Sequence, residues 1–267
     1  FWWGFIGVLY FEYVSFIGHV ELVVHRCLWT AVLLIITTAF LSKWKIFLNI
    51  LKDIKKLLYL FISGFLIFIN WAVWIYAVAT ERIIDASFGY FIMPIISVLL
   101  GYIFFKENLN NKRIFSISLV FLSIIILLFF SYKSLPWVGI IVALSWAFYN
   151  LIRKKINVDT DIGLLIESLY ILPFALIVFY FIIKNGNNDF NLSNPRLSIL
   201  LLLAGPMTVI PLFLYVRGVE LIGLGPTGMI FYITPTLQFI LGFFYYNEEF
   251  LLVKFVSFII IWIAVII

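Results

Sequence analysis

Long apolar runs, separated by short charged segments, follow one another along the whole chain. A helix needs about 20 apolar residues to cross the hydrocarbon core of a bilayer, and the runs are of about this length. The pattern therefore predicts an all-α integral membrane protein with ten transmembrane helices. The expected spans are residues 2–16, 20–41, 57–80, 86–105, 114–131, 136–152, 162–183, 197–216, 226–246 and 251–267.

The sequence also repeats itself at an offset of 141 residues. The clearest match is Tyr90–Pro94 with Gly101 and Glu107, which returns as Phe231–Pro235 with Gly242 and Glu248. Each copy holds five predicted spans, and because five is odd, the second copy enters the membrane inverted. We expect two inverted five-helix repeats, residues 1–132 and 133–267, related by a pseudo-two-fold axis in the membrane plane.

Composition agrees with a membrane protein, because 65% of the residues are hydrophobic, only 12% are charged and the mean hydropathy is +1.17. Basic residues gather in the loops after the even-numbered spans, which predicts cytoplasmic termini. Twelve of the 18 lie there: Lys43, Lys45, Lys52, Lys55, Lys56, Lys106, Lys112, Arg113, Arg153, Lys154, Lys155 and Arg217. Five lie on the other side: Arg82, Lys133, Lys184, Arg196 and Lys254.

The net charge of +5 therefore indicates contact with anionic membrane lipid rather than nucleic acid. Residues 44–58, in which lysines alternate with Ile and Leu, are expected to form a short amphipathic helix on the inner surface.

Several motifs, in order and with matching gaps, resemble the RarD branch of the EamA group in the drug/metabolite transporter superfamily. They are His25-Arg26 with Trp29, Asn70-Trp71 with Tyr76-Ala77-Val78, residues 86–94, Tyr149 with Arg153-Lys154-Lys155, Glu167 with Pro173, and residues 232–236. The resemblance implies a ten-helix carrier of two inverted repeats with cytoplasmic termini, in a bacterial inner membrane. It implies no particular substrate. One departure is Glu12, which stands where related sequences usually carry a Lys.

Apart from Glu21 and Lys254, close to span ends, three charged residues lie inside predicted spans, where a charge is costly and usually functional: Glu12, Arg26 and Glu167. Arg26 could bind a substrate carboxylate or phosphate through its planar fork; the alternative is a structural Arg tied to carbonyls or to Glu21. Glu167 could bind an ammonium group or carry a coupling proton; the alternative is a structural partner for the cytoplasmic loop. Because the two lie at opposite depths, we do not expect Arg26 and Glu167 to pair.

Pro94 and Pro235 fall at equivalent mid-span positions of the two copies. Each proline removes one helical hydrogen bond and frees a carbonyl four residues earlier, at Tyr90 and at Phe231. Unpaired carbonyls are tolerated where they line a cavity, so the two prolines are hinge candidates near the axis. The alternative is a pair of kinks that only shape packing.

Polar and aromatic residues at mid-depth complete the candidate substrate site: Asn70, Trp71, Tyr90, Trp146 and Tyr232. Aromatic faces hold cations well in a dry pocket. In a chain with 20% aromatic residues, each of them could instead pack against a neighbour or lipid.

These features favour a secondary transporter that moves a small molecule by alternating access, with a proton as a candidate coupling ion. The preferred substrate is an amino acid or related zwitterion, with Arg26 on the carboxylate and Glu12 or Glu167, with Trp71, on the amine. The alternatives are an exporter of amphiphilic drugs or organic cations, and a channel or scramblase. The chain has no HExxH, GxSxG or nucleotide-binding motif, so we expect no enzyme, metal centre or cofactor.

Overall fold

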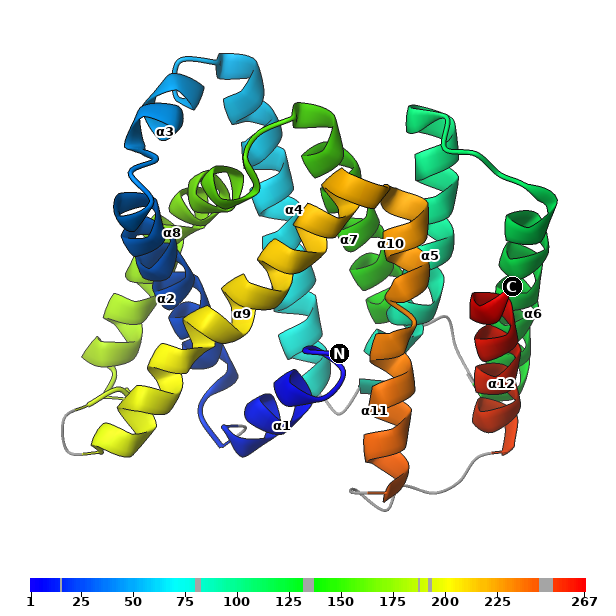
Figure 1. The fold of residues 1–267 in the computed structure, drawn as a ribbon. Coiled ribbons are helices and arrows are strands. Elements are labelled where there is room, and N and C mark those ends of the chain that lie inside the picture. Colours follow the sequence, from blue (N-terminus) through cyan, green and yellow to red (C-terminus); the bar gives the residue numbers. More distant parts are fainter. Residues whose placement is uncertain (15, 80–82, 132–136, 187, 192–193, 245–251) are drawn as a thin grey trace.

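The computed structural model describes residues 1–14, 16–79, 83–131, 137–186, 188–191, 194–244 and 252–267 (Figure 1). Within these ranges every regular element is a helix, which confirms the predicted all-α class. The helices are α1 (Ile6–Tyr13), α2 (His19–Phe40), α3 (Trp44–Ile50), α4 (Ile54–Ala79), α5 (Ile83–Phe105), α6 (Asn111–Ser131), α7 (Trp137–Ile156), α8 (Thr160–Lys184), α9 (Pro195–Ile222), α10 (Leu224–Ile230), α11 (Ile233–Phe244) and α12 (Leu252–Ile266).

Each predicted span contains a helix, and three of the predicted elements differ in extent from the structure. The first span holds only the short α1, and the ninth is divided into α10 and α11 at Phe231 and Tyr232. The expected surface helix over 44–58 ends at Ile50, and α4 begins at Ile54. Among the described residues, five stretches are long and apolar enough to cross a membrane by length and composition: 19–40, 54–74, 111–130, 160–184 and 195–222.

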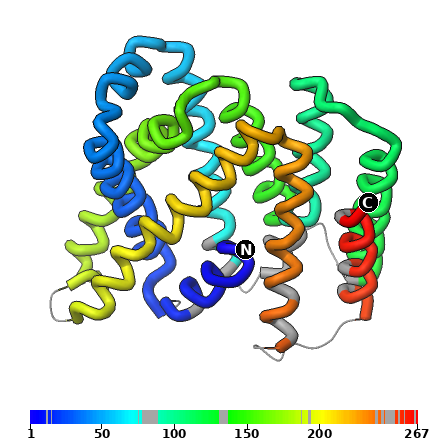
Figure 2. The backbone as a smooth tube through the Cα atoms, in the orientation of Figure 1, coloured from blue at the N-terminus to red at the C-terminus, as the bar shows by residue number. Residues whose placement is uncertain are grey.

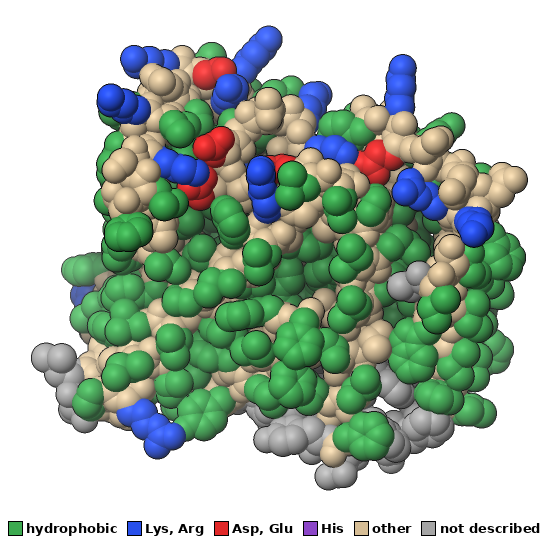
Figure 3. All heavy atoms as spheres, viewed as in Figure 1, with side chains coloured by type: hydrophobic (Ala, Val, Ile, Leu, Met, Phe, Trp, Pro, Cys, Tyr) green, Lys and Arg blue, Asp and Glu red, His purple; other side chains and the backbone are tan. Residues whose placement is uncertain are grey.

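Polar and apolar side chains are separated on the surface in the way a bilayer requires. Figure 3 shows Lys, Arg, Asp and Glu gathered at the top of the view, above a broad hydrophobic surface. This end contains α3 and the connections from α7 to α8 and from α9 to α10 (Figure 1); we call it the charged end. Large side chains such as Phe40, Phe65, Phe129 and Leu214 are more than half exposed, as expected for lipid-facing positions.

Helices from the two halves of the chain pack closely against each other (Figure 2). α2 packs on α8 and α9, α7 packs on α4 and α5, and α6 pairs with α12 beside the rest of the bundle. Where α5 meets the α10–α11 break, the rings of Tyr90 and Phe231 lie 5.7 Å apart. The Tyr232 hydroxyl donates to the Phe91 carbonyl, 141 positions away, at 2.9 Å.

The two prolines differ in their local structure. Pro94 lies inside the continuous α5, and its Cα would be 3.3 Å from a Cβ placed on Gly228 of α10. Pro235 lies in α11, just after the break in the chain path. The expectation that Pro235 leaves the Phe231 carbonyl unpaired is wrong, because that carbonyl accepts a bond from the Thr234 amide at 2.9 Å.

Glu107 explains the repeated Gly-and-Glu spacing in the first half of the chain. Its carboxylate accepts bonds from the amides of Leu224 and Gly225, at 2.8 and 2.9 Å, and from Lys154 Nζ at 2.5 Å. A Cβ on Gly101 or on Gly223 would come within 2.6 Å of the carboxylate. Burial favours a raised pKa for Glu107, but Lys154 and the two amides outweigh it and lower the pKa. The equivalent Glu248 lies outside the described residues.

Candidate functional site

A cavity with an empty volume of about 620 Å³ lies between the two halves of the chain. Its walls come from α1, α2, α4, α5, α7 and α9 and from the break before α11. The lining residues are Trp3, Gly7, Val8, Phe11, Arg26, Asn70, Trp71, Trp74, Tyr90, Trp146, Thr208, Leu212 and Phe231.

Five of the eight predicted substrate-binding residues line this cavity: Arg26, Asn70, Trp71, Tyr90 and Trp146. Tyr232 does not, since its side chain is buried against Phe91 on another face of α5. Its neighbour Phe231 takes the cavity position instead. The side chain of Glu12 lies outside the described residues, as do the sequence-predicted outer cations Arg82 and Lys133.

Arg26 is the charged side chain among the described lining residues. It is only 6% exposed, and its guanidinium carbon lies 4.8 Å from the ring centre of Phe11 and 4.9 Å from that of Trp71. Its Nε donates to Thr208 Oγ1 at 3.2 Å, and the Thr208 hydroxyl donates to the Ala204 carbonyl. Thr208 therefore positions Arg26.

Arg26 has no carboxylate partner among the described side chains. Glu21, the structural partner considered from the sequence, instead accepts bonds from the Asp189 and Phe190 amides. A buried cation between two aromatic faces is an attractive site for an anionic ligand group. The Nη groups of its fork can meet a carboxylate with two parallel hydrogen bonds.

Aromatic rings form a continuous wall opposite the guanidinium. Trp146 contacts Trp3 edge-on at 5.2 Å and Tyr215 at 5.4 Å, and Phe231 contacts Tyr215 at 5.4 Å between ring centres. Asn70 of α4 binds α7, the helix that carries Trp146. Its side-chain amide donates to the Val142 carbonyl at 2.9 Å and to Ser145 Oγ at 3.1 Å. The cavity thus offers one cation and several flat apolar surfaces.

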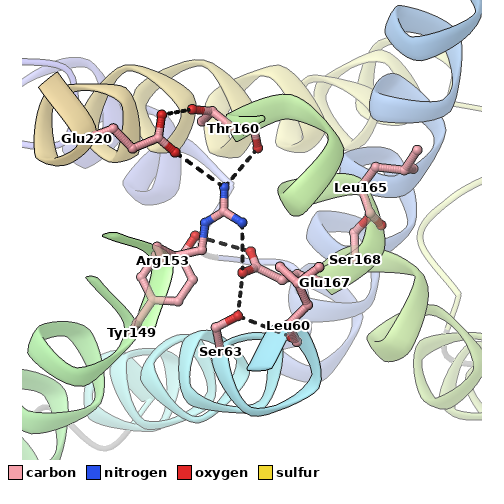
Figure 4. Close-up of polar contacts among 9 residues, drawn as sticks. All are labelled: Leu60, Ser63, Tyr149, Arg153, Thr160, Leu165, Glu167, Ser168 and Glu220. Carbon is pink, nitrogen blue, oxygen red and sulfur yellow. Dashed lines mark hydrogen bonds and ion pairs between the residues drawn. The ribbon is translucent and has the colours of Figure 1, made fainter. Parts of the chain in front are cut away.

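Glu167 lies outside this cavity, in a buried polar network nearer the charged end (Figure 4). Its carboxylate accepts bonds from Ser63 Oγ at 2.5 Å and from the Tyr149 hydroxyl at 3.2 Å, and it lies 3.6 Å from Arg153 Nη1. As expected, Glu167 and Arg26 do not pair. The network lies between the charged end and the cavity. Along α4, Lys55 is at the charged end, Ser63 follows in the network, and Trp71 lies at the cavity.

Sequence reasoning missed the position of Arg153, which we had counted among the loop cations. The side chain is fully buried, because α7 continues to Ile156 and turns position 153 inward. Gly163 of α8 makes this possible, since a Cβ there would overlap the Arg153 guanidinium. Gly163, ten residues after Arg153, was the sequence feature that could have indicated a large buried side chain here.

Comparison with known proteins was informative at the level of sequence and fold. The sequence model of the EamA-like transporter family matches residues 1–129 and 134–267. The "Uncharacterized transporter YojE" of Bacillus subtilis (strain 168) is 35% identical over 265 residues, covering 98% of this chain and 88% of that protein. "Protein RarD" of Escherichia coli (strain K12) is 32% identical over 262 residues, covering 98% and 88%.

A solved crystal structure, described only as that of a protein, shares the fold. Its TM-score is 0.67, with 98% of this chain and 94% of that chain covered. At 13% identity, this likeness concerns the fold alone.

Proposed function

The chain belongs to the EamA-like transporter family, and from this premise we propose that it is a secondary transporter that moves a small carboxylate-bearing metabolite by alternating access. It is an integral membrane protein and a transporter rather than an enzyme. The bacterial relatives support a location in a bacterial inner membrane. The proposal rests above all on Arg26, a buried cation that lines the cavity without a described carboxylate partner.

Two inverted repeats, residues 1–132 and 133–267, are part of this proposal. A two-fold axis between two copies brings equivalent positions together. The contacts between Tyr90 and Phe231 and between Phe91 and Tyr232 are of this kind, because each pair is separated by the repeat offset of 141. Such an axis would cross the bundle beside the cavity, where exchange of conformations between the halves opens one side and closes the other.

The proposed substrate is an amino acid or related compound, with its carboxylate on Arg26 and its body against Trp146 and Phe231. Glu167 is engaged by Ser63 and Tyr149, so it does not meet the amine in the described arrangement. Glu12 remains the candidate for that contact, because it follows the cavity residue Phe11 in α1.

Two alternatives from the sequence are less well supported. An exporter of organic cations is expected to have an acidic cavity, whereas the described charge is Arg26. A channel or scramblase is expected to have a continuous polar path, whereas the pocket between the cavity and Glu167 is lined mainly by apolar side chains such as Ile67 and Leu212.

A thermal-shift screen of the purified protein tests the proposal, because a ligand of the folded state raises the melting temperature by mass action. We expect amino acids or other small carboxylates to stabilise the protein, and organic cations of similar size not to do so. Stabilisation by organic cations alone would instead identify the protein as an exporter of organic cations.

The proposed ten spans with cytoplasmic termini predict a labelling pattern for single cysteines in a Cys27→Ser background. A cysteine at Lys55 or Lys155 should be shielded from an impermeant reagent outside intact cells, whereas one at Asn185 should react. These three positions are exposed, so burial does not limit the reaction. Reaction at Lys55 from outside would invert the orientation.

The proline hinges predict a transport defect without a large loss of protein. Pro94→Ala restores the backbone N–H that α5 lacks, and Pro235→Ala restores the one that α11 lacks just after the break, so both proposed hinges should become stiffer. We expect both variants to transport more slowly than the wild type at similar expression. Wild-type rates in both would make these prolines packing residues only.

A further inference from the structure

Arg153 lies between two carboxylates that belong to different helices (Figure 4). Its Nη1 is 3.6 Å from Glu167 Oε1 on α8, and its Nη2 is 3.8 Å from Glu220 Oε1 on α9. Neither distance is that of a good hydrogen bond, and Nη1 and Nε have no hydrogen-bond partner among the described residues. The firm contact of the guanidinium is from Nη2 to the Thr160 carbonyl at 3.2 Å.

The charges of these three side chains balance only when Arg217 is included. Arg153 supplies one positive charge against the two carboxylates of Glu167 and Glu220. Arg153 and Glu167 are almost completely buried, whereas Glu220 is 18% exposed and is bound by the exposed Arg217 at 3.1 Å. Buried charge is tolerated when it is paired and hydrogen-bonded, and the pairing of Arg153 with Glu167 is incomplete at 3.6 Å, so the Glu167 carboxylate is a candidate to bind a proton.

The group has two carboxylates within reach of Arg153. The guanidinium lies at similar distances from both, 3.6 Å from Glu167 and 3.8 Å from Glu220. On one side, a narrow pocket touches Glu167 and shares Trp71 and Leu212 with the central cavity. On the other side, Glu220 connects the group to Arg217 and the charged surface.

We propose that Glu167 is a proton-binding site that couples transport to a proton gradient, with Arg153 as the side chain that changes partner. Protonation of the Glu167 carboxylate by water removes its negative charge, and Arg153 then pairs with Glu220. Loss of the proton restores the first pairing. The groups that face Glu167 are Ser63 from α4 and Tyr149 and Arg153 from α7, with Glu220 of α9 beyond Arg153.

The exchange of partners has a mechanical consequence for the bundle. Ser63 belongs to the first half of the chain, and Glu167 and Arg153 belong to the second. The bond from Ser63 to Glu167 therefore ties α4 to α8 above the cavity. Protonation weakens this tie because the hydroxyl then donates to a neutral acid rather than to a carboxylate.

This inference rests on the proposed transport function, but its test needs no substrate. Infrared difference spectra of the purified protein in lipid vesicles, recorded across pH, report the carbonyl stretch of a protonated carboxylic acid. We expect a pH-dependent band that is lost in Glu167→Gln and retained in Glu21→Gln. Glu21 is the matched control, because it is equally buried but lies near the opposite end of the bundle. Retention of the band in Glu167→Gln would overturn the assignment.

Accessibility provides a second readout that a purely structural role would not change. Ile67 is 2% exposed and lines the narrow pocket next to Glu167. In a Cys27→Ser, Ile67→Cys protein, labelling by a water-soluble maleimide should change several-fold with pH, after correction for thiol ionisation. The pH response should disappear in Glu167→Gln and persist in Glu21→Gln. A response that persists in a cooperatively melting Glu167→Gln protein would reject the coupling role.

A third variant keeps the test valid if Glu167→Gln does not fold. Ser63→Ala retains the carboxylate and removes its shortest hydrogen bond, so the midpoint of the infrared titration should shift. An unchanged midpoint would show that the titrating acid is another residue. Failure of the ligand screen together with a positive infrared result would reject the proposed substrate class while keeping the proton site.

Discussion

An Arg26→Lys variant is expected to bind a carboxylate substrate about 5- to 150-fold more weakly than the wild type. The guanidinium offers two parallel hydrogen bonds in one plane, whereas the lysine ammonium is a point charge on a flexible stem. Loss of one charge-assisted hydrogen bond costs about 1–3 kcal/mol, which corresponds to this range. The aromatic surroundings add to the effect, because the guanidinium carbon lies over the rings of Phe11 and Trp71, 4.8 and 4.9 Å from their centres. Binding isotherms from thermal shift or calorimetry measure the loss.

Two controls separate recognition from structure in this experiment. Arg196→Lys makes the same change at an exposed position and should leave affinity unchanged. A substrate analogue without its carboxylate should bind wild type and Arg26→Lys protein equally. If this analogue binds the wild type as tightly as the parent compound does, Arg26 is a structural residue and the ligand is not held by its carboxylate.

Replacement of Arg153 by Met is expected to lower the free energy of unfolding by about 3–5 kcal/mol. Removing one partner of a buried ion pair leaves the other charge uncompensated, and here Glu167 would lose its cation while Glu220 keeps Arg217. The loss should show as a lower midpoint of thermal unfolding in detergent at neutral pH. It should become smaller in acid, where protonation removes the uncompensated charge.

A double variant tests whether charge is the cause. Arg153→Met with Glu167→Gln removes both charges, and we expect it to recover much of the stability lost in the single variant. Lys155→Met, an exposed position on the same helix, should change little. Equal stability of the single and double variants would show that Arg153 acts through its packed volume rather than its charge.

The positions of the helices could be predicted from the sequence because the bilayer imposes a simple rule on apolar length. Some cavity residues could also be predicted, because Arg26 and Asn70 are polar side chains that are costly in contact with lipid and therefore face the protein interior. Phe231 was missed in favour of Tyr232, because we chose the residue with a hydroxyl. The helix is interrupted at these two residues, and the sequence does not show which of the two side chains faces the cavity.

Arg153 shows a second limit of sequence reasoning. Three consecutive basic residues at the end of an apolar run have the composition of a loop, and composition does not give the rotation of a helix. In the structure, Arg153 is buried, Lys154 binds Glu107 and Lys155 is exposed. The division of α10 from α11 was hidden for a related reason, because Pro235 marked a kink whereas the helix is interrupted at Phe231 and Tyr232.

The two aromatic pairs at the repeat junction have opposite order, with Tyr90 before Phe91 in one half and Phe231 before Tyr232 in the other. If the halves descend from one duplicated gene, each residue once faced a copy of itself, and both hydroxyls had the same surroundings. Now the Tyr90 side chain lines the cavity and the Tyr232 hydroxyl is fixed to a backbone carbonyl. An exchange of conformations between the halves would therefore not reproduce the same set of contacts. In the proposed alternating access, the inward-open and outward-open states would then differ in free energy, so even without a gradient the empty protein would favour one of the two states.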